Sequence, residues 1–374
     1  MNIPLSRPDI TSVEKQYVLE VLDTPFLSLG PKLGLFEEKI IRFVGSKHCV
    51  AVNSGTSALH LAIRSLKIKK KDEVITTPYS FIASSNCIMF EDAKPVFADI
   101  DPKSLNIDPN DVLEKISSKT KAILPVHVFG YPLEMKAIMD IAEDHNLAII
   151  EDSCEAIGAK YYNQYVGTFG DFGSFAFYPN KQITTGEGGV LITNNDDLAK
   201  SARSMRNQGR SDSDSWLNHE ILGYNYRISD INCALGIAQL ERIEEILEKR
   251  KNVADYYFQK LRSINEFILP LKGDNNHVPS WFVFVIRITQ DSGIKKEDIM
   301  DFLSKKGVST GNYFPSIHLQ PLYRKKFGYS EGSFKNTEEA SNTSFAIPFF
   351  TNITNEEQDF VVKTLQEAII ALSK

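Results

Sequence analysis

The sequence predicts an α/β fold: a large domain with a mainly parallel seven-stranded sheet flanked by helices, and a smaller C-terminal α+β domain. Three observations predict it. Short apolar runs alternate with helix-like stretches between about residues 47 and 193, as in successive βαβ units. A long amphipathic stripe follows Ser229, and a strand pattern with two helical patterns completes the chain. We expect the domains to span residues 1–245 and 246–374.

The seven apolar runs are short, as expected for strands that are covered on both faces of a sheet. They are Cys49–Val52, Glu73–Ile75, Pro95–Ala98, Ala122–Val126, Ala148–Ile150, Ser174–Phe177 and Val190–Thr193. Between them, Thr56–Leu66 and Leu133–His145 carry apolar residues at helical spacing. We expect these two helices to cover the sheet.

The amphipathic stripe after Ser229 continues to Leu261, which is long for a single globular helix. We therefore expect one bent helix, or two, leading from the large domain into the second. In that second domain, Trp281–Ile288 alternates like a strand, and an irregular segment covers Gly311–Pro321. The expected helices there are Lys296–Lys306 and Asn355–Ser373.

Composition and charge exclude several classes of protein. The chain has 374 residues, of which 42% are hydrophobic and 24% charged, close to the average soluble protein. Its net charge of −6 provides no global positive field for nucleic acid or anionic lipid. No apolar stretch approaches the roughly 20 residues that span a bilayer, and we find no signal peptide. The four scattered cysteines suggest neither disulfides nor a zinc site, so we expect a cytoplasmic protein without a metal.

Polar residues that directly follow strands are the candidates for chemistry, because ligands of parallel sheets bind beyond the carboxyl ends of the strands. One strand leads through Ser54, Gly55 and Thr56 into a helix, whose free N–H groups and positive dipole end suit a phosphate. Another strand ends in Glu151 and Asp152, and a buried carboxylate there needs a partner. An ordinary helix N-cap is the alternative interpretation of both segments.

A third strand leads through Tyr178 and Asn180 to Lys181, and a glycine-rich turn follows over Thr184–Gly189. Because aromatic residues precede it, this lysine does not lie on a plainly solvated helical face. Apolar surroundings favour the neutral amine that Schiff-base formation requires. A phosphate cradle, a strand-end acid and a sequestered lysine together meet the needs of pyridoxal 5′-phosphate (PLP). The lysine forms the imine, the acid keeps the pyridine nitrogen protonated, and the helix N-terminus holds the phosphate.

With these residues the chain resembles the PLP-dependent sugar aminotransferases of the DegT/StrS family, which share the aspartate aminotransferase fold, known as fold type I. The segment Phe177–Lys181 together with Thr184–Gly189 is highly specific for that family. The other matching segments span nearly the whole chain. They are Pro4–Pro8, Phe26–Pro31, Asn53–Leu59, Thr77–Phe81, Val126–Gly130, Glu151–Gly158, Gly223–Arg227 and His318–Pro321.

The resemblance implies a role for each matched residue. Lys181 is the Schiff-base lysine and proton carrier, and Asp152 is the partner of the pyridine nitrogen. The phosphate is held by Gly55 and Thr56, and Phe81 stacks on the cofactor ring.

The resemblance also implies a homodimer with shared active sites, in which Asn225 reaches the phosphate bound by the neighbouring subunit. Asn180, Arg227, Tyr313 and His318 are implied to contact the substrate. A structural ion pair remains an alternative for Arg227, and ordinary packing remains one for Tyr313 and His318.

Two residues depart from the family pattern. Many relatives have a serine five residues before the lysine, where this chain has Ala176, so Ser174 is the nearby candidate for a phosphate contact. Glu155 stands where many relatives have glutamine or histidine beside the phenolic oxygen of the cofactor. Because two facing anions repel, we expect an inward-pointing Glu155 to be protonated, with its pKa raised by that neighbour and by burial.

By resemblance, the reaction is a ping-pong transfer of an amino group from L-glutamate to a nucleotide-linked keto-sugar, in polysaccharide biosynthesis. The segment Glu155–Gly158 is closer to relatives that aminate C4 than to the Gln-Ala-His-Gly of relatives that aminate C3. We therefore expect a 4-keto-6-deoxy sugar. Three alternatives stay open: a C3 aminotransferase, a PLP-dependent sugar dehydratase, in which histidine replaces the lysine, and a non-catalytic PLP-binding regulator.

Overall fold

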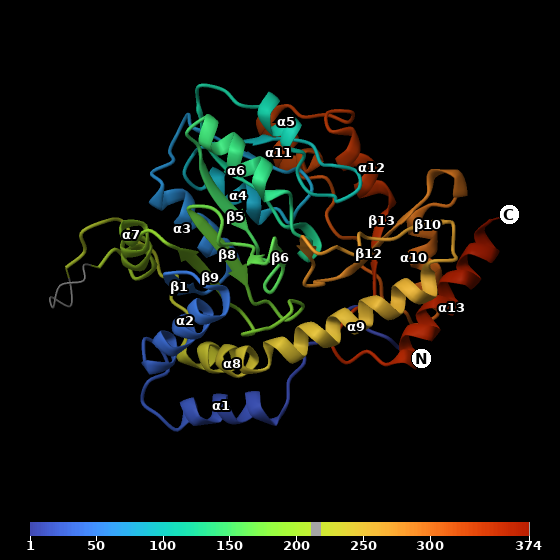
Figure 1. Cartoon of the computed structure of the whole chain (residues 1–374), viewed down its shortest axis with the longest axis horizontal. Helices are drawn as coiled ribbons and strands as arrows, with labels where there is room; N and C mark the ends of the chain where they lie inside the picture. Colours follow the sequence, from blue (N-terminus) through green and yellow to red (C-terminus); the bar gives the residue numbers. More distant parts are fainter. Residues whose placement is uncertain (211–217, 374) are drawn as a thin grey trace.

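A computed structural model of the chain describes residues 1–210 and 218–373. Figure 1 shows a large sheet with helices around it and, beyond the long helix α9 (Ile243–Leu261), a smaller sheet with its own helices. This arrangement confirms the predicted α/β fold with a second, smaller α+β part. Within the described residues, we find no helix that is both long and apolar enough to cross a membrane.

All seven expected strands lie in one sheet, in the order β1-β9-β8-β5-β4-β2-β3. Only β9 runs antiparallel to its neighbours, β1 and β8, so the sheet is mainly parallel, as predicted. The bounds are β1 His48–Val52, β2 Glu73–Thr76, β3 Lys94–Phe97, β4 Thr120–Leu124, β5 Ala148–Asp152, β8 Phe172–Ala176 and β9 Gly189–Thr193. The strand β5 extends two residues beyond the prediction, which places Asp152 at its carboxyl end.

Helices cover both faces of this sheet, because the apolar residues of its strands alternate between two cores. In β1, Val50 and Val52 pack with α3, whereas Cys49 and Ala51 pack with α2 and α8. The helices of this part are α1 Ser12–Leu22, α2 Pro31–Val44, α3 Gly55–Ser65, α4 Ala83–Met89, α5 Pro109–Glu114, α6 Met135–Asp144, α7 Asp196–Arg206 and α8 Asp230–Glu241. The helices expected at Thr56–Leu66 and Leu133–His145 correspond to α3 and α6.

The C-terminal part is built on an antiparallel sheet in the order β10-β12-β13. Ile3 also belongs to its core, and the backbone there pairs in parallel with Val308. The bounds are β10 Phe267–Ile268, β12 Phe284–Ile288, β13 Ser344–Ile347, α10 Lys296–Lys305, α11 Pro321–Phe327, α12 Lys335–Thr343 and α13 Asn355–Leu372. A third small sheet contains β6 Lys160–Tyr161, β7 Gln164–Tyr165 and β11 His277–Val278, and short 3-10 helices cover Val128–Gly130, Gln290–Ser292 and Ile317–Leu319.

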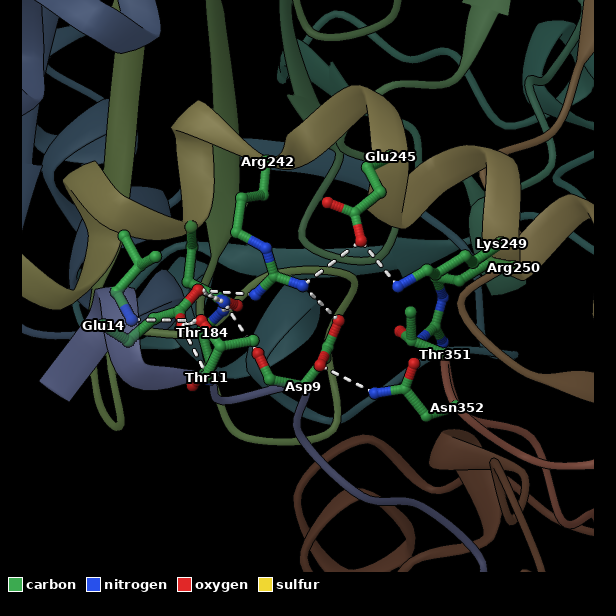
Figure 2. Close-up of polar contacts among 12 residues, drawn as sticks. Asp9, Thr11, Glu14, Thr184, Arg242, Glu245, Lys249, Arg250, Thr351 and Asn352 are labelled. Atoms are coloured by element: carbon green, nitrogen blue, oxygen red, sulfur yellow. Dashed lines mark hydrogen bonds and ion pairs between the residues drawn. The ribbon is translucent and has the colours of Figure 1, made fainter.

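The predicted amphipathic stripe after Ser229 forms two helices, α8 and α9, and Arg242 lies at the break between them. Its guanidinium donates from Nη1 to Glu14 Oε1 and from Nη2 to Asp9 Oδ2, both at 2.8 Å. Asn352 donates to the other oxygen of Asp9 at 2.7 Å, so the break, the N-terminal segment and the C-terminal part meet in one network (Figure 2). The predicted domain boundary after residue 245 lies close to this break and stays a prediction.

Glu14 makes this network sensitive to pH. Burial acts to raise its pKa, but hydrogen bonds from Thr11, Arg242 and Gln239 outweigh burial and lower the pKa of Glu14 from 4.5 to about 2. A depressed pKa stabilises the fold above the unfolded-state value, here by about 3 kcal/mol, and this stabilisation is lost as the pH falls towards 2. We expect Glu14→Gln to lower the free energy of unfolding by a similar amount at pH 7.

Urea unfolding of the wild type and of Glu14→Gln between pH 7 and pH 3 measures this effect. The difference between the two proteins should shrink as the pH falls below about 4.5. Glu20→Gln serves as the matched control, because Glu20 lies on the same helix and its side chain is 47% exposed. A difference that stays constant over this pH range would contradict the assignment.

Candidate active site

A cavity of about 710 Å³ opens at the carboxyl ends of β5 and β8. The start of α3 and residues of the C-terminal part complete its wall. Eight of the twelve site residues expected from the sequence line it: Gly55, Thr56, Phe81, Asp152, Glu155, Asn180, Lys181 and Tyr313.

The N-terminus of α3 forms one end of the cavity. Ser54 is the N-cap, and its Oγ accepts a hydrogen bond from Ser57 N at 3.1 Å. Within the part of the chain that the structure describes, no hydrogen bond uses the N–H of Gly55 or of Thr56. A Cβ at position 55 would lie 2.8 Å from Ala176 Cβ, so the close approach to β8 requires glycine. Two free N–H groups at a helix N-terminus fit a phosphate.

Asp152 ends β5 inside the cavity and is only 5% exposed. Its Oδ2 accepts a hydrogen bond from Ser84 Oγ at 2.7 Å, and its Oδ1 accepts one from Cys154 N at 3.1 Å. These two bonds offset part of the cost of burying the carboxylate and fix its direction. A fixed carboxylate in this place fits the protonated nitrogen of a pyridine ring.

Lys181 lies in the turn that follows β8, with Nζ 3.4 Å from Glu155 Oε1. The same Nζ lies 4.0 Å from the centroid of the Phe282 ring. Gln182 anchors the turn, because its Nε2 donates to Glu155 O at 2.6 Å and to Ser280 Oγ at 2.8 Å. The amine is therefore held between a carboxyl group and the face of an aromatic ring.

Glu155 points into the cavity and is 6% exposed. Its Oε2 accepts a hydrogen bond from Phe129 N at 3.0 Å. Burial is the main cause that raises the pKa of Glu155 above its ordinary value, and Asp152 adds to it, while Lys181 opposes the shift. The direction agrees with the expectation of a carboxyl group that holds its proton to higher pH.

We expect Glu155→Gln to change the pH dependence of two quantities: the melting temperature of cofactor-free protein and the visible absorbance of PLP-loaded protein. In cofactor-free protein the raised pKa costs the wild type stability as the pH rises through the unfolded-state value, so the variant should gain melting temperature relative to wild type between pH 4 and pH 7. In PLP-loaded protein, the pH midpoint of the visible absorbance should fall by about one unit, because Glu155 favours the cation beside it once it has lost its proton, whereas the amide does not.

Glu187→Gln is the matched control for this test, since Glu187 lines the same cavity but is exposed. An unchanged midpoint in Glu155→Gln would refute the predicted link between Glu155 and the cofactor.

Four residues expected in the site lie outside the cavity lining. Ser174 is buried and donates from Oγ to Glu151 O at 3.3 Å. Asn225 is exposed, and Arg227 donates from Nη1 to Asn207 Oδ1 at 3.2 Å. The cavity of a single chain therefore does not include these three side chains, and their cofactor and substrate contacts stay predictions.

The fourth residue, His318, is fully buried, and its Nε2 lies 3.0 Å from Glu338 Oε1. Burial lowers the pKa of His318, and Glu338 opposes that shift. His127 is also buried, with Nε2 3.1 Å from Glu151 Oε2. In the structure both histidines are parts of the packed interior, and the substrate contact of His318 stays a prediction.

The cavity contains residues that the sequence analysis did not select: Tyr178, Ser84, Phe282, Asn312 and Gln320. Tyr178 lies within the specific segment Phe177–Lys181, which could have pointed to it. Phe282 gave no such indication, because an apolar residue in an alternating strand predicts a core position.

PLP fits these residues. The free N–H groups of Gly55 and Thr56, the fixed carboxylate of Asp152 and the amine of Lys181 all face one cavity. They supply a phosphate site, a partner for the ring nitrogen and a group for covalent attachment.

Residues 8–366 match the model of the DegT/DnrJ/EryC1/StrS aminotransferase family. GDP-perosamine synthase of Escherichia coli O157:H7 is 34% identical over 98% of each chain, and the spore coat polysaccharide biosynthesis protein SpsC of Bacillus subtilis is 34% identical over 98% of this chain and 97% of its own. PseC of Helicobacter pylori, an aminotransferase involved in pseudoaminic acid biosynthesis, has a TM-score of 0.94 and 29% identity, covering 99% of this chain and 100% of its own. The chain therefore belongs to the DegT/DnrJ/EryC1/StrS aminotransferase family and is a PLP-dependent sugar aminotransferase.

Proposed function

We propose that the chain transfers the amino group of L-glutamate to C4 of a nucleotide-linked 4-keto-6-deoxy sugar. The observation that supports this most directly is the cavity in which Lys181, Asp152 and the N-terminus of α3 meet. The segment that begins at Glu155 favours C4 over C3, as the sequence analysis argued. A relative named GDP-perosamine synthase supports a nucleotide-linked sugar as the acceptor.

When bound, PLP supplies an electron sink that stabilises negative charge on the reacting carbon of the substrate. Lys181 would hold the cofactor through Nζ, and its free amine would carry a proton from the α-carbon of the donor. Asp152 orients the ring and keeps its nitrogen protonated, while Gly55 and Thr56 hold the phosphate. Phe81 is 63% exposed at the cavity, where a stacked ring would cover it. Donor and acceptor use this cavity in turn, which makes the mechanism ping-pong.

The charge of the cavity supports a site shared between two subunits. The lining contains three carboxyl groups, on Asp152, Glu155 and Glu187, and one cationic side chain, Lys181. Within the described residues of this lining, the phosphate has the N–H groups of Gly55 and Thr56, but Lys181 is the one cation, so the added negative charge of a nucleotide diphosphate needs further donors from outside. We propose that a homodimer provides them, with the exposed Asn225 reaching the site of the neighbouring subunit.

The same residues argue against two of the alternatives. Lys181 stands where the sugar dehydratases have histidine, which argues against a dehydratase. The paired carboxylate and amine argue against a regulator that only binds PLP. The four free cysteines agree with a reducing cytoplasm as the proposed location.

A substrate screen tests the proposed function. UDP-, dTDP- and GDP-linked 4-keto-6-deoxy sugars are incubated with the PLP-loaded protein and L-glutamate, and product mass and then NMR locate the new amine. An amine on C4 is expected, whereas an amine on C3 would select the C3 alternative. A visible spectrum that L-glutamate leaves unchanged would contradict glutamate as the donor.

A further inference from the structure

Arg250 of α9 is a buried cation whose acceptors are all neutral. It is 2% exposed, and no carboxylate forms an ion pair with it within residues 1–210 and 218–373. Its Nε donates to Trp281 O at 2.8 Å, its Nη2 to Phe282 O at 2.7 Å, and its Nη1 to Thr351 Oγ1 at 3.3 Å. Burying a charge without an opposite charge is costly, so these three bonds and the segment that they hold are what offset the cost.

The two carbonyl groups can share one guanidinium because the backbone at Trp281 is left-handed, with φ of +54°. In an extended strand successive carbonyls point to opposite sides, and the left-handed residue turns this pair towards Arg250. A bulky residue in this conformation is strained. The hydrogen bonds of the planar guanidinium therefore hold the chain in a conformation that it would not adopt alone.

The segment that Arg250 holds, Ser280–Phe282, lies against the turn that contains Lys181. Phe282 places its ring 4.0 Å from Lys181 Nζ, and Ser280 Oγ accepts the hydrogen bond from Gln182, the next residue along. Ser280 N also donates to Gly130 O at 3.0 Å, which fixes the other side of the segment. Arg250 thus binds the carbonyl group of Phe282, and the ring of the same residue contacts Nζ of Lys181.

We propose that Arg250 is a positioning residue for Lys181, acting through Phe282. The guanidinium fixes the Trp281–Phe282 backbone, the backbone fixes the ring, and the ring face holds the Lys181 nitrogen and stabilises positive charge on it. Glu155 is the titratable side chain that also contacts this nitrogen, with Oε1 at 3.4 Å. The proposal rests on the proposed role of Lys181 as the residue that attaches the cofactor.

Two variants test the proposal. Arg250→Lys keeps a charge but cannot span three acceptors, and Phe282→Leu keeps apolar bulk but removes the ring face. For both we expect the pH midpoint of the visible absorbance of PLP-loaded protein to fall by about one unit, because positive charge on the nitrogen loses a favourable contact. We also expect capture of PLP by cofactor-free protein, followed by growth of the visible band, to slow about tenfold.

Two control variants separate positioning from stability. Lys251→Met changes the next residue of the same helix, whose side chain is 57% exposed. Phe349→Leu removes the ring that stacks on Arg250 at 5.0 Å, and Phe349 does not line the cavity. Both controls should keep the absorbance midpoint of the wild type, even where Phe349→Leu lowers the melting temperature.

The double variant decides whether Arg250 acts through Phe282. Adding Arg250→Lys to Phe282→Leu should lower the midpoint no further than Phe282→Leu alone, whereas additive shifts would contradict the route through the ring. The proposal is overturned if Arg250→Lys lowers only the melting temperature. If that variant does not fold, an unchanged midpoint in Phe282→Leu overturns it equally.

Borohydride reduction and peptide mass spectrometry of the wild type distinguish a failure of the Arg250 proposal from a failure of the proposed function. If the cofactor is fixed to Lys181 but Arg250→Lys and Phe282→Leu keep the absorbance midpoint of the wild type, only the role of Arg250 is rejected. A cofactor that is not fixed to Lys181 rejects the proposed function itself.

Discussion

Replacing Lys181 by alanine is expected to lower the rate of amino transfer by at least about 10⁴-fold, because one side chain supplies both the nucleophile and the proton carrier. Lys181→Arg should be equally inactive, since a guanidinium keeps the charge but does not attach the cofactor. The single-turnover reaction with L-glutamate, followed by the change in visible absorbance, measures the loss. An added small primary amine should restore part of the rate in Lys181→Ala, where it replaces the missing proton carrier.

The control for this loss is Lys251→Ala, which removes an exposed lysine and should react like the wild type. A rate within tenfold of wild type in Lys181→Ala would mean that another group performs both steps.

Asp152→Asn is expected to give the second largest loss, about 10³-fold, because the buried charge opposite the ring nitrogen disappears. The amide oxygen can still accept the hydrogen bond from Cys154 N, and the amide NH2 can donate to the Ser84 hydroxyl, so the geometry should persist while the charge does not. The variant should also bind PLP more weakly, yet unfold no more easily without cofactor, since a buried carboxylate without a cation is itself unfavourable.

Equilibrium titration with PLP and melting curves with and without cofactor separate these effects. Asp144→Asn, an exposed acid at the end of α6, is the control for the removal of one negative charge. Equal loss of stability with and without PLP would assign Asp152 to the fold rather than to the cofactor.

The elements of the large sheet could be predicted because their apolar runs are short and their spacing is regular, as at Cys49–Val52 and Val190–Thr193. The break at Arg242 could not be located in the same way. Apolar residues continue across it at helical spacing, from Leu240 to Ile243. The partners that hold the break, Asp9 and Glu14, lie more than 200 positions away in the sequence.

The sequence likewise predicted some residues of the candidate site and missed others. Asp152 and Lys181 could be selected because polar residues directly after buried strands are unusual and chemically suggestive. The place of Phe282 depends on a left-handed residue before it and on an arginine of another helix, neither of which a local pattern reveals. The burial of His318 depends on the aromatic residues around it, such as Phe334 at 4.8 Å between ring centroids.

The pairing of Ile3 with Val308 also determines the order in which the chain can fold during synthesis. Ile3 N donates to Gly307 O at 2.8 Å, and Ser309 N donates to Ile3 O at 3.0 Å, so this part of the small core needs two segments that lie far apart in the sequence. At roughly 5–20 residues per second, the ribosome needs roughly 15–60 s to add the residues between them. For that time Ile3 lacks its partners, while the large sheet can already assemble.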